Sequence, residues 1–157
     1  KVKVPSTHCD ERVQTICGDV MNIGRNKIRE LSPQGEGFSV ILSDMCPSVS
    51  GITTRDAALS VELGARAVEL AVGEDPLATN DGEDANCSNG NDDVEGVLRP
   101  GGNLVIKLLE SEDIKELGDF CKPRFKKASW LRPKATRATS REIYLICQGL
   151  KETSSKK

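Results

Sequence analysis

Aromatic residues are scarce in this sequence. They make up 3% of its 157 residues, so a folded core must be built mostly from aliphatic side chains. Apolar runs such as Val40-Ile41-Leu42 and Leu104-Val105-Ile106 are typical of strands that are buried on both faces. No apolar run approaches the roughly 20 residues that a membrane-spanning helix needs, so we expect no membrane partner. The length fits a single domain.

Residues that bind metals are also few. The chain has one histidine, His8, and none of its six cysteines forms a Cys-x-x-Cys pair, so we expect no metal site. Thiols without a disulfide framework favour a reducing, intracellular compartment, which leaves cytoplasm, nucleus and an organelle such as the mitochondrion open. A Gly-x-Gly-x-x-Gly fingerprint is missing too, which argues against a nicotinamide-dependent oxidoreductase.

Acidic and basic residues are separated along the chain. The segment between Gly73 and Gly96 contains eight acidic residues and no basic one. The whole chain has 24 acidic and 22 basic residues, so the rest of it has 16 acidic against 22 basic. No carboxylate lies in 120–141, although eight basic residues do. Such a basic stretch suits a phosphate backbone, and it is equally compatible with an ordinary solvated surface.

Hydrophobic periodicity predicts alternating strands and helices. We expect strands at 12–20, 38–43, 103–109, 126–131 and 142–148. Helices are expected at 26–31, 56–72, 94–98 and 111–121. Asp56 should cap the second helix and Gly73 should end it, whereas Ser111 or Glu112 should cap the last. Turns are predicted at 32–37 and 99–102.

This order of elements predicts an α/β domain over residues 1–150, followed by a polar basic tail at 151–157. Strands that alternate with helices favour a parallel core, and the last two strands, with no helix between them, should pair antiparallel at one edge. The acidic stretch 74–93 lacks apolar periodicity, so we expect a disordered surface insertion there.

Three polar residues adjoin the ends of predicted strands. Asp44 follows one apolar strand, Lys107 interrupts another, and Glu142 opens the last. Ligands bind outside the carboxyl ends of parallel strands, and an antiparallel last strand would begin at that same edge. The three side chains should therefore converge. Each also has an ordinary explanation, as a turn cap, a lysine that extends its ammonium to water, or half of a surface ion pair.

Three segments resemble successive motifs of the FtsJ/RrmJ ribosomal RNA methyltransferase family in order and spacing. They are Ser-Asp-Met-Cys-Pro-Ser-Val-Ser-Gly at 43–51, Pro-Gly-Gly-Asn-Leu-Val-Ile-Lys at 100–107, and Lys-Ala-Thr-Arg-Ala-Thr-Ser-Arg-Glu-Ile-Tyr at 134–144. The resemblance covers nearly the whole chain except the acidic stretch. It implies a Rossmann-like S-adenosylmethionine-dependent methyltransferase sheet, mostly parallel, with an antiparallel last strand.

The resemblance also implies roles for particular residues. The family uses a Lys-Asp-Lys-Glu tetrad, whose last three members match Asp44, Lys107 and Glu142, and Lys107 would accept the proton of a ribose 2′-hydroxyl. S-adenosylmethionine would be bound by Asp19, in a Gly-Asp loop, and by Asp44. The enzyme would then be a uridine-2′-O-methyltransferase acting on ribosomal RNA.

An RNA substrate agrees with the basic stretch, because the 2′-hydroxyl is the group that distinguishes RNA from DNA. We expect RNA contacts from the basic side chains of Lys126, Lys127, Lys134, Arg137 and Arg141. We also expect a monomer. The alternative is a non-catalytic RNA-binding module with a methyltransferase-like fold.

Some parts of the family pattern would precede Lys1, namely the glycine-rich cofactor loop, an acidic residue after the second strand, and the first lysine of the tetrad. We therefore expect an N-terminally truncated methyltransferase domain that is inactive as given. Lysine has an ordinary pKa of about 10.4, and a second ammonium nearby would lower it. Without that neighbour Lys107 should stay protonated, and methyl transfer to RNA by this chain alone would contradict the expectation.

Calorimetry with S-adenosylmethionine tests the cofactor assignment. We expect binding by a version of the chain extended at its N-terminus through the glycine-rich loop, and none by the 157-residue chain itself. By the resemblance, only the extended version would contain the family's glycine-rich cofactor loop. If neither version bound, the cofactor assignment would fail and the RNA-binding module would become the leading hypothesis.

Overall fold

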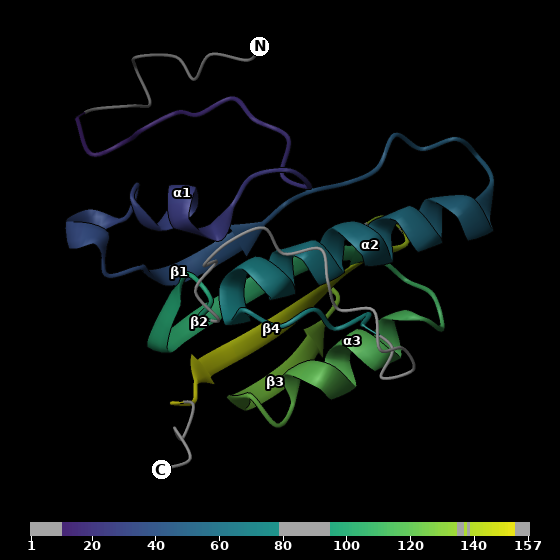
Figure 1. Cartoon of the computed structure of the whole chain (residues 1–157). Coiled ribbons are helices and arrows are strands. Elements are labelled where there is room, and N and C mark those ends of the chain that lie inside the picture. The colour runs from purple at the N-terminus through teal and green to yellow at the C-terminus, as the bar shows by residue number, and fades with distance from the viewer. Residues whose placement is uncertain (1–10, 79–94, 135–136, 138, 153–157) are drawn as a thin grey trace.

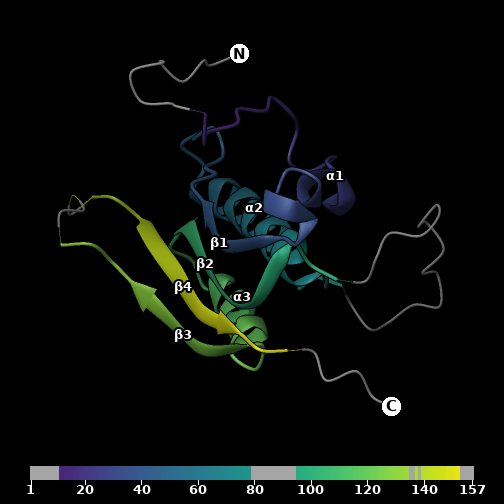
Figure 2. The ribbon, with the colours of Figure 1, turned by 90° about the vertical axis from the view of Figure 1, so that its left-hand side faces the viewer.

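The computed structural model describes residues 11–78, 95–134, 137 and 139–152, which form one mixed sheet with helices packed against it (Figures 1 and 2). The described elements are α1 (Arg25–Arg29), the short 3-10 helix η1 (Pro33–Gly35), β1 (Phe38–Ser43), α2 (Thr53–Val72), β2 (Leu98–Leu109), α3 (Ile114–Cys121), β3 (Phe125–Leu131) and β4 (Glu142–Leu150). The strand order is β1-β2-β4-β3. β1 and β2 run parallel, whereas β4 is antiparallel to both β2 and β3.

The core lies between the sheet and helices α2 and α3. Along β2, the alternate residues Leu104, Ile106 and Leu108 are buried. They form one apolar cluster with side chains of the two helices, among them Val68 and Leu117. Both helices therefore cover the same face of the sheet, and the other residues of β2 project to the opposite face. Burial of aliphatic side chains holds this layer together, as the scarcity of aromatic residues predicts.

Several predicted elements are confirmed. The strand at 38–43 matches β1, and the strands expected at 103–109, 126–131 and 142–148 lie within β2, β3 and β4. The last two strands pair antiparallel at the edge of the sheet. Gly73 ends α2 in the left-handed conformation, with a φ of 94°. The α/β class with an antiparallel last strand is thus the observed fold.

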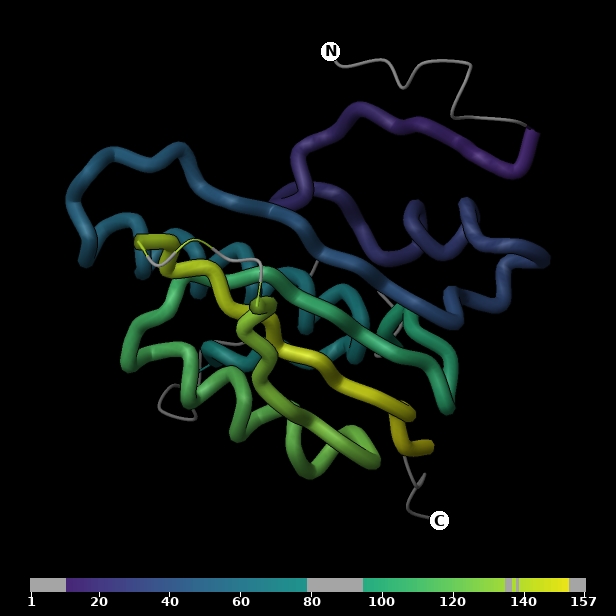
Figure 3. Tube along the Cα trace, turned by 180° about the vertical axis from the view of Figure 1, so that it is seen from behind, coloured from purple at the N-terminus to yellow at the C-terminus, as the bar shows by residue number. Residues whose placement is uncertain are grey.

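The strand predicted at 12–20 is wrong. Residues 13–19 have no regular secondary structure, and Figure 3 shows this part of the chain running apart from the sheet. A strand needs a neighbour to pair its backbone N–H and C=O groups. Among the described strands none lies beside 12–20, so its alternating pattern has nothing to pair with. One parallel pair therefore remains, and the described sheet is mixed.

The segment that leads into β2 also differs from the prediction. Residues 95–97 are not helical, and Leu98 already begins β2, so the helix predicted at 94–98 is wrong. The turn expected at 99–102 is a bulge inside β2. Phe38 pairs with Leu98 and Val40 with Asn103, so residues 99–102 stand opposite a single residue of β1. Gly101, with a φ of 78°, allows the chain to bend there.

The starts of the two long helices were misplaced. α2 begins at Thr53, so Asp56 lies in its first turn instead of capping it. α3 begins at Ile114 after Asp113, so neither Ser111 nor Glu112 is the capping residue. Most of the insertion expected at 74–93 lies outside the described residues, and so does most of the 151–157 tail. Within the described part of the chain, no helix is long and apolar enough to span a bilayer.

Gly96 gives a test of this packing. A Cβ atom there would lie 2.0 Å from the carbonyl oxygen of Ala71 in α2, and backbone cannot move aside as a side chain can. We expect Gly96→Ala to lower the free energy of unfolding by about 3 kcal/mol. Gly24→Ala is the matched control, since nothing lies within 4 Å of its added Cβ. Urea unfolding measures both, and equal midpoints for the two variants would contradict the described contact.

Candidate active site at the carboxyl edge of the sheet

Three strand ends bring the predicted residues together. Ser43, the last residue of β1, pairs with Ile106, so Asp44 and Lys107 follow side by side. Leu109 pairs with Glu142, the first residue of β4, which runs the other way. Lys107 Nζ lies 2.5 Å from Asp44 Oδ1. The structure thus places Asp44, Lys107 and Glu142 at one edge, as the antiparallel last strand predicts.

The environment of Lys107 favours its charged form. Its side chain is only 14% exposed, whereas that of Asp44 is 84% exposed. The hydrogen bond to Asp44 raises the pKa of Lys107 above its usual value; burial acts in the opposite direction, and the charges of Asp44, Glu142 and Cys46 raise it further. Lys107 is therefore an ammonium paired with Asp44 at neutral pH. Two carboxylates hold it and oppose the loss of its proton.

Asp56 fixes the loop that follows Asp44. Its side chain is 3% exposed and accepts hydrogen bonds from the backbone N–H of Ser50 (2.9 Å), the hydroxyl of Ser50 (2.6 Å) and the N–H of Gly51 (3.2 Å). The bonds from Ser50 lower the pKa of Asp56 below its usual value. The sequence pattern predicts only a capping role for Asp56. Asp56 instead anchors the connection between Asp44 and α2.

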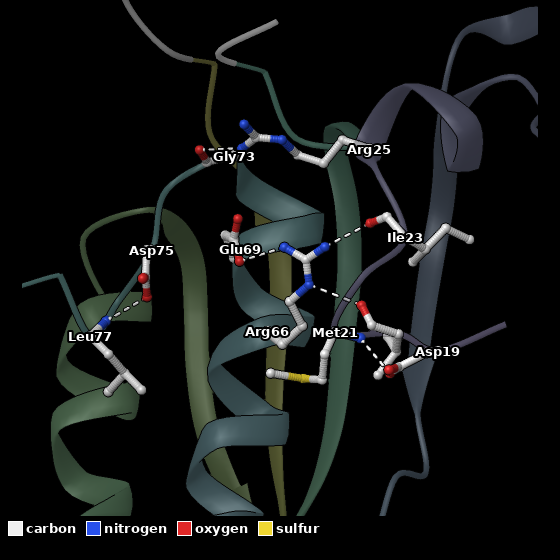
Figure 4. A network of polar contacts seen from close by, with 10 residues as sticks. Asp19, Met21, Ile23, Arg25, Arg66, Glu69, Gly73, Asp75 and Leu77 are labelled. Atoms are coloured by element: carbon white, nitrogen blue, oxygen red, sulfur yellow. Dashed lines mark hydrogen bonds and ion pairs between the residues drawn. The ribbon is translucent and has the colours of Figure 1, made fainter. Parts of the chain in front are cut away.

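Asp19 lies in a turn that is tied to α2. Its carboxylate accepts a hydrogen bond from Met21 N (3.0 Å), and it remains exposed. Arg66 of α2 donates to the carbonyl of Val20, within that turn (3.0 Å), and to the carbonyl of Ile23, at its end (2.6 Å) (Figure 4). The arginine therefore holds the Gly-Asp loop in place although the strand predicted before it is absent.

A cavity of about 380 Å³ connects the Asp19 turn with the site. Val20 and Asp44 both line it, and its other walls are mostly apolar side chains of β1, α1 and α2. Apolar walls with a few polar groups are typical of cofactor pockets. Among the described residues, no group of three metal-binding side chains is close enough to hold an ion.

The predicted RNA-binding residues are distributed unevenly. Lys126 and Lys127 are exposed on β3, the edge strand, and Lys134 and Arg137 are exposed in the loop that follows it. Arg141 is different, because it is only partly exposed and its guanidinium donates to backbone carbonyls. Nothing in the sequence pattern predicts these contacts of Arg141 with the backbone.

The two aromatic residues near the end of the chain, Trp130 and Tyr144, lie on opposite faces of the sheet. Tyr144 pairs with Lys107 across the β2–β4 ladder, so both side chains lie on the sheet face away from α2 and α3. Trp130 lies on the helical side, where its ring contacts Gly118 of α3. Trp130 is thus a packing residue that remains 37% exposed.

Comparisons with known proteins show the family to which the chain belongs. The family model of FtsJ-like methyltransferases matches residues 2–150. The chain is 31% identical over 137 residues to ribosomal RNA large subunit methyltransferase E of Archaeoglobus fulgidus, covering 87% of this chain and 58% of that protein. The protein of that name from Syntrophobacter fumaroxidans is 32% identical over 143 residues, covering 91% of this chain and 60% of that protein.

A solved structure from Plasmodium falciparum, described as a ribosomal RNA methyltransferase, has a similar fold. It superposes with a TM-score of 0.55 at 21% identity, over 81% of this chain and 54% of that one. This chain spans about half the length of the curated relatives that it matches, with 58%, 44% and 52% of three of them covered.

The anchoring by Asp56 can be tested through its pH dependence. Its pKa is lowered from 3.8, so its contribution to stability is complete above about pH 4 and is lost as the pH falls through the lower folded-state pKa. Asp56→Asn should therefore destabilise the chain at pH 7, because the amide loses the charge and turns N–H donors toward Ser50 and Gly51. The difference from the wild type should shrink near pH 2.

Urea unfolding at both pH values measures this effect. Asp75→Asn is the matched control, since Asp75 is exposed and, within the described part of the chain, its carboxylate accepts a hydrogen bond from Leu77 N in its own turn. Equal midpoints for Asp56→Asn and the wild type at pH 7 would show that the loop does not depend on this carboxylate.

Proposed function

Because this chain belongs to the FtsJ-like methyltransferase family, we propose that the whole protein transfers a methyl group from S-adenosylmethionine to a ribose 2′-hydroxyl of ribosomal RNA. Relatives named ribosomal RNA large subunit methyltransferase E support the choice of substrate. The observation that carries the proposal is the meeting of Asp44, Lys107 and Glu142 at the carboxyl edge of the sheet. A uridine of the large subunit is the proposed target.

Lys107 is the proposed proton acceptor. The 2′-hydroxyl must lose its proton as its oxygen attacks, and only the neutral amine can take that proton. Asp44 holds Nζ at one position and Glu142 adds negative charge from β4, so the two carboxylates orient Lys107. The same carboxylates keep most of the lysine protonated at pH 7. The rate of proton transfer is then limited by the small neutral fraction.

The cavity beside Asp44 is the proposed cofactor pocket. When bound, S-adenosylmethionine supplies the methyl group and a positive sulfonium. The apolar walls suit its adenine, and the exposed carboxylate of Asp44 suits its positive charge. Among the described residues, the Asp19 carboxylate accepts hydrogen bonds from Met21 N and Asn22 Nδ2, one on each oxygen, and a carboxylate has about four acceptor sites. We propose that Asp19 and Asp44 bind the cofactor.

The proposed RNA contacts are the exposed basic residues of β3 and of the following loop, Lys126, Lys127, Lys134 and Arg137. The second candidate function is a non-catalytic RNA-binding module of the same fold. One observation favours it, namely the Asp44–Lys107 ion pair, which raises the pKa of the proposed base. We further propose that the protein is a monomer. We also propose a reducing compartment, because the four described cysteines are free thiols.

The two candidate functions differ in their response to a change at Lys107. If Lys107 is the base, Lys107→Ala should lower kcat by about 10²–10⁴-fold. Its raised pKa also means that kcat should increase about tenfold per pH unit between pH 7 and 9, because each unit multiplies the neutral fraction by ten. Methylation of ribosomal RNA by the extended version of the chain provides the measurement.

Lys115→Ala is the matched control, because Lys115 is an exposed lysine of α3 outside the site, and it should keep the wild-type kcat. A Lys107→Ala protein with unchanged kcat would exclude Lys107 as the base. An absence of methylation by the wild type, with RNA binding retained, would favour the non-catalytic module.

A further inference from the structure

Arg141 and Glu110 bind each other through main-chain and side-chain atoms. The N–H of Glu110 donates to the carbonyl of Arg141 at 2.7 Å, and Arg141 Nη2 donates to the carbonyl of Glu110 at 2.7 Å. This reciprocal pair comes directly after the last ladder pair of β2 and β4, Leu109 with Glu142. Glu142 is therefore held beside β2 by the ladder on its C-terminal side and by the Arg141–Glu110 bonds on its N-terminal side.

The same guanidinium also reaches the helical layer. Arg141 Nη1 donates to the carbonyl of Thr53, the first residue of α2, at 3.4 Å. Thr53 follows the loop that begins at Asp44 and is anchored by Asp56. Arg141 thus contacts the end of β2, the start of α2 and, through its own backbone, the start of β4. These are the elements that carry Lys107, the Asp44 loop and Glu142.

Side chains alternate between the two faces of a sheet, so the neighbouring residues Arg141 and Glu142 point to opposite faces. Glu142 pairs with Leu109, which lies on the same face as Lys107, so the carboxylate of Glu142 faces the site. Arg141 comes one residue earlier, so its side chain leaves toward the face covered by α2. The guanidinium is turned toward the start of α2, and the donors that it gives to two backbone carbonyls are not available to a phosphate.

We propose that Arg141 is a positioning residue that holds Glu142 beside Lys107, and that it is not an RNA phosphate contact. The importance of that position rests on the proposed function, which gives Glu142 its role. A planar guanidinium presents donors in a fixed fork, so one side chain can serve two carbonyls at once. A lysine keeps the positive charge but lacks the fork, so it should not replace Arg141.

The pKa of Lys107 reports on this arrangement in the whole 157-residue chain, by NMR titration of its ammonium. The charged or titratable groups acting on it are Asp44, Glu142 and Cys46. Glu142→Gln removes one negative neighbour and should lower the pKa. If Arg141 positions Glu142, Arg141→Lys should lower it by most of the same amount, although no charge has been removed.

In Arg141→Gln, the direction in which the pKa of Lys107 changes shows whether Arg141 acts by positioning Glu142 or by its own charge. Loss of a positive charge alone would raise the pKa of Lys107, whereas displacement of Glu142 would lower it. We expect a lower pKa in both Arg141 variants. A wild-type pKa in Arg141→Lys, or a raised pKa in Arg141→Gln, would overturn the proposal. Thermal unfolding accompanies each titration, and only variants with a cooperative transition are compared.

Binding of a short fluorescent oligouridylate at several salt concentrations tests the second half of the proposal. Each lost phosphate contact should reduce the slope of log K against log salt by about 0.7. Lys127→Ala, on the exposed edge strand, should show that reduction, whereas Arg141→Gln should keep the wild-type slope. An equal reduction in Arg141→Gln would make Arg141 a phosphate contact. Neither measurement depends on methyl transfer, so a failed methylation assay leaves both results interpretable.

Discussion

A strand that runs against its neighbours begins where they end, and the candidate site depends on that constraint. β1 and β2 deliver Asp44 and Lys107 at their carboxyl ends, and antiparallel β4 brings Glu142 to the same edge with its first residue. Three residues that are far apart in sequence meet without any loop having to fold back over the sheet. The other contacts at this edge, by Asp56 and Arg141, fix the connections on the helical side of the same junction.

The site combines two requirements that oppose each other electrostatically. A lysine that is held in place by carboxylates is well oriented, and the same carboxylates stabilise the protonated form that cannot act as a base. In the structure the ion pair with Asp44 orients Lys107, and its raised pKa favours the protonated form. Positive charge close to Asp44 and Lys107 would shift the balance toward the amine, and the cavity that Asp44 lines is the place where such a charge would lie. The carboxylates thus orient Lys107, whereas its deprotonation would need a separate positive charge nearby.

Sequence patterns predicted the bounds of several elements, but the expectation that β1 is buried on both faces is wrong, since Val40 is 49% and Leu42 73% exposed. The continuous apolar run of β1 gave its bounds, and Gly73 gave the end of α2 because only a left-handed residue closes the helix there. The segment 12–20 failed because alternation predicts a strand only if a neighbour pairs with it. The convergence of Asp44, Lys107 and Glu142 followed from topology.

The internal roles of Asp56 and Arg141 did not follow, since their partners are backbone groups of other segments, which leave no mark in the sequence. Composition showed that Arg141 belongs to a basic stretch, and only the structure distinguishes it from its exposed neighbours. The prediction that it binds RNA is untested, and the contacts described above give it another use.

The acidic segment between Gly73 and Gly96 begins and ends at the edge of the sheet opposite the candidate site, where three arginines bind its two ends. Arg25 donates to the carbonyl of Gly73, Arg124 pairs with Glu74, and Arg29 donates to the carbonyl of Gly96. Because of the bulge at 99–102, the stretch from Leu98 to Lys107 advances along the sheet only as far as Phe38 to Asp44. That is six residues, on the order of 20 Å, which is more than twice the distance over which salt screens a charge in the cell, about 8 Å. This edge can therefore accept added or deleted residues, or a fused domain, while the chemistry at the other edge keeps its geometry and its electric field.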